Sequence, residues 1–103
     1  PPMTESKIRR LRLLAADANP GIRASAAWSR HLPDDLAASL AHDPDREVRR
    51  WVARNETVSC DVLRELATDA DESVRAFVAV NFFAPEDAMA RLANDESDQV
   101  RGL

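Results

Sequence analysis

Residues 66–75 read Leu-Ala-Thr-Asp-Ala-Asp-Glu-Ser-Val-Arg, and this stretch decides the fold. Its pattern, Leu-Ala-x-Asp-x-x-x-x-Val/Ile-Arg, occurs four times at intervals of 26 residues, beginning at Leu14, Leu40, Leu66 and Leu92. Self-similarity at a fixed period of this length is the signature of a repeat protein. We set Pro1 and Pro2 aside because they precede Met3. The rest divides into one domain, 3–103, with a half repeat 3–21, full repeats 22–47, 48–73 and 74–99, and a partial repeat 100–103.

Within each unit the apolar residues have helical spacing. Val48, Trp51 and Val52 lie at positions i, i+3 and i+4, which places them on one face of a short helix. Val62, Leu63 and Leu66 form the corresponding stripe of a second helix. Helices of roughly eight to ten residues are too short to be stable alone, so neighbouring units must cover each other's apolar faces. The pattern predicts an all-α fold, specifically a right-handed α-solenoid of 26-residue helix-turn-helix repeats.

The residues between the stripes predict where the helices begin and end. Asn55 and Asn81 follow the first helix of their units, and asparagine tolerates the left-handed conformation that often ends a helix. Pro33 and Pro85 stand where the second helix opens, at the first helical position. Asp45 stands where the next helix needs a cap.

The repeated aspartate and arginine residues look functional but have a structural interpretation. Asp43 and Arg49 lie six residues apart across a predicted turn, and the same pair recurs in every unit. A residue type kept in each unit of a stack usually ties one unit to the next. We therefore interpret these rows as a structural ladder, with a ligand site as the less favoured alternative.

Composition excludes several classes of protein. Two glycines and no tyrosine among 103 residues argue against an all-β fold. No apolar run reaches the roughly 18 residues that a membrane span needs, and no signal peptide is recognisable. A single cysteine, Cys60, fits a reducing compartment, so a cytoplasmic location is expected. The net charge is −4, divided into +3 over residues 1–54 and −7 over residues 55–103, which would orient a charged partner.

Residues 11–103 resemble the leucine-rich repeat variant family, a group of HEAT-like helical repeats, and we expect the protein to be bacterial. The best match is Val74-Arg75-Ala76-Phe77-Val78-Ala79-Val80-Asn81, continued by Pro85, Met89, Leu92, Ala93 and Asp95. The resemblance implies a helical solenoid with an extended recognition surface. One member of that family carries an iron–sulfur cluster on a cysteine-rich segment, but Cys60 alone cannot hold a cluster, so we expect no cofactor.

Function in a repeat protein is expected where one unit departs from the others. Trp28 takes the position of Arg54 and Val80, and it is either an exposed interface anchor or a residue covered by the N-terminal helix. Phe82 and Phe83 lie in a turn, where they either form an exposed partner surface or place one ring inward to fill a gap.

Four arginines near the second full repeat suggest an alternative. Helical arginines at this spacing could contact phosphates, as in DNA-binding HEAT-like proteins; they are Arg46, Arg49, Arg50 and Arg54. Acidic residues in the same segment favour a salt-bridged surface instead. Nucleic-acid binding is therefore the second hypothesis.

Catalysis and metal binding have no support in the sequence. His31 and His42 lie eleven residues apart without a cysteine pair or a Glu-x-x-His motif, and no catalytic triad or phosphate loop stands out. We predict a non-enzymatic scaffold or adaptor that binds a protein or peptide and no membrane. The predicted contact residues are Trp28, Arg50, Arg54, Val80, Phe82 and Phe83. Apolar residues at both ends, such as Leu13 and Leu103, further suggest a longer array or an end-on homodimer.

Overall fold

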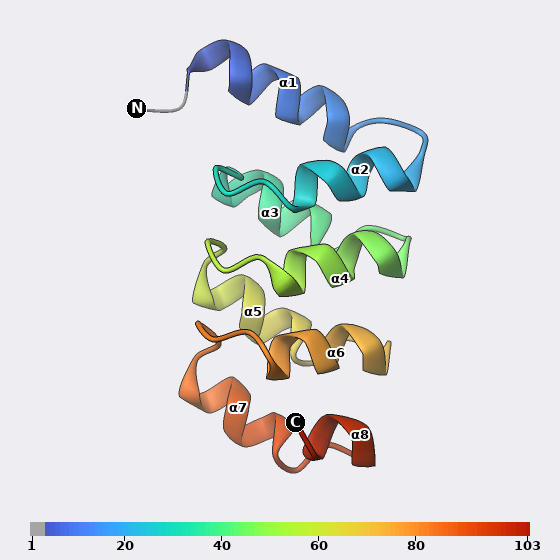
Figure 1. The fold of residues 1–103 in the computed structure, drawn as a ribbon, viewed down its shortest axis with the longest axis vertical. Helices are drawn as coiled ribbons and strands as arrows, with labels where there is room; N and C mark the ends of the chain where they lie inside the picture. The colour runs from blue at the N-terminus through green and yellow to red at the C-terminus, as the bar shows by residue number, and fades with distance from the viewer. Residues whose placement is uncertain (1–3) are drawn as a thin grey trace.

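The computed structural model describes residues 4–103, and within that range it contains eight helices and no strand (Figure 1). The helices are α1 (Glu5–Ala15), α2 (Pro20–Ala27), α3 (Asp34–Leu40), α4 (Arg46–Arg54), α5 (Cys60–Leu66), α6 (Glu72–Ala79), α7 (Glu86–Leu92) and α8 (Asp98–Arg101). The predicted all-α fold is confirmed. Met3, at which the predicted domain begins, lies outside the described residues.

The helices form two rows along the long axis of the molecule. Helices α2, α4, α6 and α8 follow one another down the first row, and α3, α5 and α7 form the second (Figure 1). Helix α1 packs on α2 at the N-terminal end of the stack. The first residues of the first row recur every 26 positions, at Pro20, Arg46, Glu72 and Asp98. Those of the second row do the same, at Asp34, Cys60 and Glu86.

The starts of the helices follow from the side chains that precede them. Asp45 and Asp71 cap α4 and α6, each accepting the backbone N–H of the residue two positions on at 2.8 Å. The prediction for Asp45 is confirmed. Pro33 and Pro85 are N-cap residues rather than the first helical residues, because their ψ angles of 146° and 153° are still extended.

The core lies between the two rows. The side chains that are almost fully enclosed are aliphatic residues at repeated positions: Val48, Val52, Leu63, Leu66, Val74, Val78, Leu92 and Val100. Small residues at the ends of the first-row helices, Ala27 and Ala53, have no exposed surface and let adjacent helices approach closely. Trp51 and Phe77 share the predicted apolar stripe but are only partly buried: they pack against the core, and the Arg54 guanidinium lies over their rings.

No helix in the described part of the chain is long and apolar enough to cross a membrane.

Candidate partner-binding site

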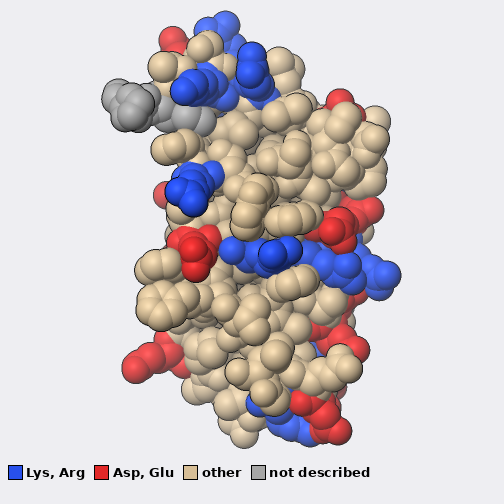
Figure 2. All heavy atoms as spheres, in the orientation of Figure 1, with Lys and Arg blue, Asp and Glu red and all other residues tan. Residues whose placement is uncertain are grey.

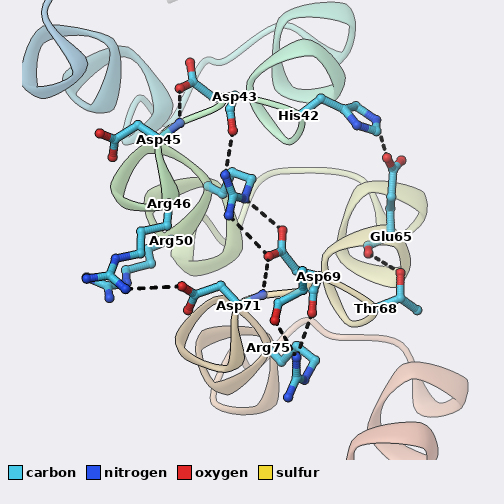
Figure 3. A network of polar contacts seen from close by, with 12 residues as sticks. His42, Asp43, Asp45, Arg46, Arg50, Glu65, Thr68, Asp69, Asp71 and Arg75 are labelled. Atoms are coloured by element: carbon cyan, nitrogen blue, oxygen red, sulfur yellow. Dashed lines mark hydrogen bonds and ion pairs between the residues drawn. The ribbon is translucent and has the colours of Figure 1, made fainter.

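One edge of the stack carries a continuous ladder of arginine and aspartate side chains (Figure 3). Arg49 donates from Nε to Asp69 Oδ2 at 2.9 Å and from Nη1 to the backbone oxygen of Asp43 at 2.7 Å. Arg75 repeats the arrangement, with Asp95 at 2.8 Å and the backbone oxygen of Asp69 at 2.7 Å. Each guanidinium therefore joins the turn before its own helix to the following turn on the same edge.

The ladder accounts for one of the predicted phosphate contacts. The side chain of Arg49 is only 17% exposed, and its donors are used within the chain. Arg49 therefore acts in the stack and does not belong to the outer surface.

Asp71, which caps α6, and Asp95, which belongs to the ladder, are both held in their ionised form. The pKa of Asp71 is lowered to about 2, chiefly because the Ser73 hydroxyl donates to its carboxylate. Burial alone would raise the pKa of Asp95, but hydrogen bonds from Arg75 and from the backbone N–H of Ser97 outweigh it and lower the pKa. Both groups are anions at neutral pH, as capping and ion pairing require.

Asparagine side chains form a second, buried connection between units. Asn55 Nδ2 donates to the backbone oxygens of Ala27 and Ser29 at 2.9 and 2.8 Å, both in the preceding unit. Asn81 Nδ2 likewise donates to two backbone oxygens of the unit that precedes its own. The predicted left-handed conformation is wrong, because no non-glycine residue among 4–103 has a positive φ. These asparagines are required for their amide groups, which satisfy carbonyls at the end of a neighbouring helix.

An aromatic cluster surrounds the end of α4. The Arg54 guanidinium lies over the rings of Trp51, Phe77 and Trp28, at 4.6, 5.1 and 5.6 Å from their centroids. Trp28 meets Trp51 edge to face, with centroids 4.8 Å apart. Trp28 is nonetheless 53% exposed, so α1 does not cover it.

The turn after α6 adds further apolar surface. Phe82 and Phe83 are 84% and 54% exposed, and their rings form a T-shaped pair with centroids 5.2 Å apart. Neither ring points into the core, so the alternative in which one phenylalanine fills an internal gap does not hold. Val80, at the end of α6, is also exposed.

A surface pocket of about 550 Å³ lies between these two groups. Its walls come from the ends of α2 and α4 and from the turns that follow α2, α4 and α6; the lining residues are Trp28, Arg30, Arg54, Asn55, Glu56, Thr57 and Phe83. Trp28, Arg54 and Phe83, all predicted contact residues, therefore meet at one site.

The sequence prediction does not include Arg30, Glu56 and Thr57. A signal for them exists, because Arg30, Glu56 and Phe82 stand at the same repeat position, 26 residues apart. In the structure, residues from the turns after α2, α4 and α6 line the same pocket.

The remaining predicted arginines, Arg46 and Arg50, lie at the start and in the middle of α4. Arg50 donates to Ser73 Oγ at 2.7 Å and to Glu47 at 2.9 Å, and Arg46 pairs with Asp71 at 3.5 Å. Figure 2 shows a band of arginine side chains crossing the molecule at the level of α4, bordered by acidic residues and by uncharged surface. Most of this positive charge is already paired with carboxylates of the chain.

Among residues 4–103, no three His, Cys, Asp or Glu side chains gather in a way that could hold a metal ion. His42 pairs with Glu65 (Figure 3). Comparison with protein-family models, with curated proteins and with solved structures finds no match to the chain. Its function is therefore inferred from the geometry of this surface.

Proposed function

We propose that the chain is a non-catalytic scaffold or adaptor that binds a protein or peptide through the face bearing Trp28, Phe82 and Phe83. We further propose that it is a right-handed α-solenoid of 26-residue repeats, akin to the leucine-rich repeat variant family. A cytoplasmic location and an end-on homodimer remain predictions from the sequence.

The repeated polar connections support the solenoid interpretation. Three ladder ion pairs each join residues 20 positions apart: Arg23–Asp43, Arg49–Asp69 and Arg75–Asp95. Asn55 and Asn81 each bond backbone oxygens 26 and 28 positions earlier in the chain. Bonds that recur at a fixed separation are what identical units in a linear stack require, because each unit contacts only its neighbours.

The exposed aromatic residues are the observation that carries the binding proposal. Three of the largest apolar side chains, Trp28, Phe82 and Phe83, are each more than half exposed beside one pocket. Large apolar side chains gathered on one surface mark interaction sites, and Trp and Arg are the residues most often found at the energetic centre of an interface.

Nucleic-acid binding is less well supported than protein binding. Arg46, Arg49 and Arg50 all pair with groups of the chain itself, which leaves Arg54 alone of the four predicted phosphate contacts without such a partner among residues 4–103. Affinity for a duplex grows with the number of phosphates that are neutralised, and a single unpaired arginine supplies little.

A pull-down from a bacterial lysate tests the proposed function. The wild type is compared with Phe82→Ser/Phe83→Ser, which removes most of the exposed aromatic surface without touching the core. Met89→Ser serves as the matched control, because Met89 is an exposed apolar residue of α7 that does not line the pocket. We expect quantitative mass spectrometry to show proteins retained by the wild type and by Met89→Ser and depleted at least about tenfold with the double variant.

Identical sets of proteins bound by all three forms would contradict the proposal. Titration with duplex DNA at two salt concentrations tests the alternative, nucleic-acid binding. We expect no saturable binding at either concentration. Salt-dependent binding that is lost in Arg50→Glu would instead identify a nucleic-acid-binding protein.

A further inference from the structure

Arg54 differs from the ladder arginines in what surrounds its charge. Three aromatic rings hold its guanidinium by cation–π contacts, with ring centroids between 4.6 and 5.6 Å from Cζ. No carboxylate or carbonyl within residues 4–103 accepts a hydrogen bond from it, in contrast to Arg49 and Arg75. The cation is therefore fixed in position while its N–H donors stay free for a ligand.

Such an arginine is well suited to bind a carboxylate. The guanidinium presents paired N–H groups that match two carboxylate oxygens, and charge-assisted bonds of this kind are about twice as strong as neutral ones. Because the rings have already fixed the side chain and removed part of its hydration, less conformational entropy is lost when a ligand binds.

The other residues that line the pocket also favour a negatively charged ligand. Arg30 is a second exposed arginine without a carboxylate partner among residues 4–103, and Glu56 is the one acidic residue in the lining. The pocket therefore carries a net positive charge. Trp28 and Phe83 supply apolar walls beside it.

We propose that Arg54 binds an Asp or Glu side chain of the partner, and that the partner is an acidic peptide segment in which this carboxylate adjoins a large apolar residue. The apolar residue packs on Trp28 and Phe83. The inference rests on the proposed function and specifies the chemistry of the ligand.

The surroundings favour a peptide over a polyanion. Net charge is −7 over residues 55–103, so a phosphate backbone extending from the pocket toward α5–α7 would meet repulsion. A short segment with one or two carboxylates meets only the local positive charge. All lining residues except Asn55 are exposed, so the pocket is an open hollow across which an internal segment can pass. A side-chain carboxylate therefore fits the site better than a chain end does.

Selection from random dodecapeptides displayed on phage by their C-termini tests the inference, because no free peptide carboxyl terminus is present. We expect the selected peptides to be enriched in Asp or Glu within two residues of Phe, Trp or Leu. Amidated synthetic copies should bind the wild type in a fluorescence-anisotropy titration. Arg54→Gln should weaken that binding at least about tenfold, and Arg54→Lys should weaken it less, because lysine keeps the charge but loses the paired donors.

Arg91→Gln is the matched control, since Arg91 is exposed on α7 and lies outside the pocket. It should leave the affinity unchanged. Asp→Asn or Glu→Gln in the peptide should cause the same loss as Arg54→Gln, and the two changes together should add little further loss. Circular dichroism of each variant verifies that the fold is retained.

The outcomes separate the inference from the proposed function. Neutral or basic selected peptides that depend on Trp28 but tolerate Arg54→Gln would overturn the carboxylate site and leave peptide binding in place. Failure to select any peptide above a Trp28→Ala/Phe83→Ala background would contradict both. If a single-stranded oligonucleotide bound more tightly than the selected peptides, and this binding depended on Arg54, the ligand would be a nucleic acid and not a peptide.

Discussion

Replacing Asn55 by alanine is expected to lower the free energy of unfolding by about 3 kcal/mol. The side chain is only 3% exposed, and it bonds two backbone carbonyls of the preceding unit while accepting the backbone N–H of Thr57 at 2.9 Å. One of those carbonyls belongs to Ala27, which has no exposed surface. A buried polar group left without a partner costs about 1–3 kcal/mol, and alanine can replace none of the lost bonds.

That loss is large for a chain of this size, whose total stability is expected to be about 5–15 kcal/mol. Urea denaturation followed by circular dichroism measures it. Ser29→Ala is the matched control, because Ser29 stands at the same repeat position but its side chain only accepts a hydrogen bond from the backbone N–H of His31, and the backbone oxygen that Asn55 bonds is kept. We expect the control to lose less than about 1 kcal/mol. Equal losses in the two variants would show that the asparagine bonds do not hold the units together.

Arg75→Met is expected to lower the free energy of unfolding by about 3 kcal/mol or more. The side chains of Arg75 and Asp95 are 9% and 8% exposed, so the substitution leaves a nearly buried carboxylate without its counter-ion. It also removes the hydrogen bond to the backbone oxygen of Asp69. Methionine keeps most of the apolar stem of arginine, so the loss reports chiefly on the charge and its hydrogen bonds.

Arg64→Met is the control for this prediction. Arg64 also forms an ion pair with a residue of the next unit, Asp87, but the two side chains are 46% and 64% exposed. Exposed pairs of this kind contribute about 0–1 kcal/mol, so the control should change stability little.

The effect of Arg75→Met should also depend on pH in a defined direction. In the wild type the pKa of Asp95 is lowered, so its contribution to stability is present above the usual aspartate pKa and is lost as pH falls. Without Arg75, burial favours the protonated acid, and acidification should help the variant. The difference between wild type and variant should therefore shrink between pH 7 and pH 4. A difference that is constant or grows on acidification would contradict the assigned role of the pair.

The sequence predicts the helices well because their determinants are local and repeated. The apolar spacing around Val48 and the cap at Asp45 each depend on residues within one turn of a helix, and both match the structure. The role of Asn55 could not be predicted in this way. Its hydrogen-bond partners lie 26 and 28 positions earlier in the chain. The residues next to Asn55 indicate only that a helix ends there.

The candidate site could likewise be predicted from the sequence only in part. The departure of Trp28, Phe82 and Phe83 from the repeat identifies them as unusual, but their exposure depends on how α1 and the turn after α6 pack. The pocket also brings in Arg30, which resembles an ordinary surface arginine in the sequence. Only the folded structure places Arg30 and Arg54 in the lining of one pocket.

Distances between spin labels at equivalent repeat positions test the stacked arrangement most directly. Asp34, Cys60 and Glu86 are the first residues of α3, α5 and α7, spaced by 26 positions, and all three are exposed. Electron paramagnetic resonance on Asp34→Cys and on Glu86→Cys, each paired with Cys60, should give two equal separations on the order of 10 Å, the usual distance between packed helices. Asp34→Cys/Glu86→Cys in a Cys60→Ser background should give about twice that value. Unequal neighbouring separations, or an outer pair no farther apart than the neighbours, would contradict a linear stack of equivalent units.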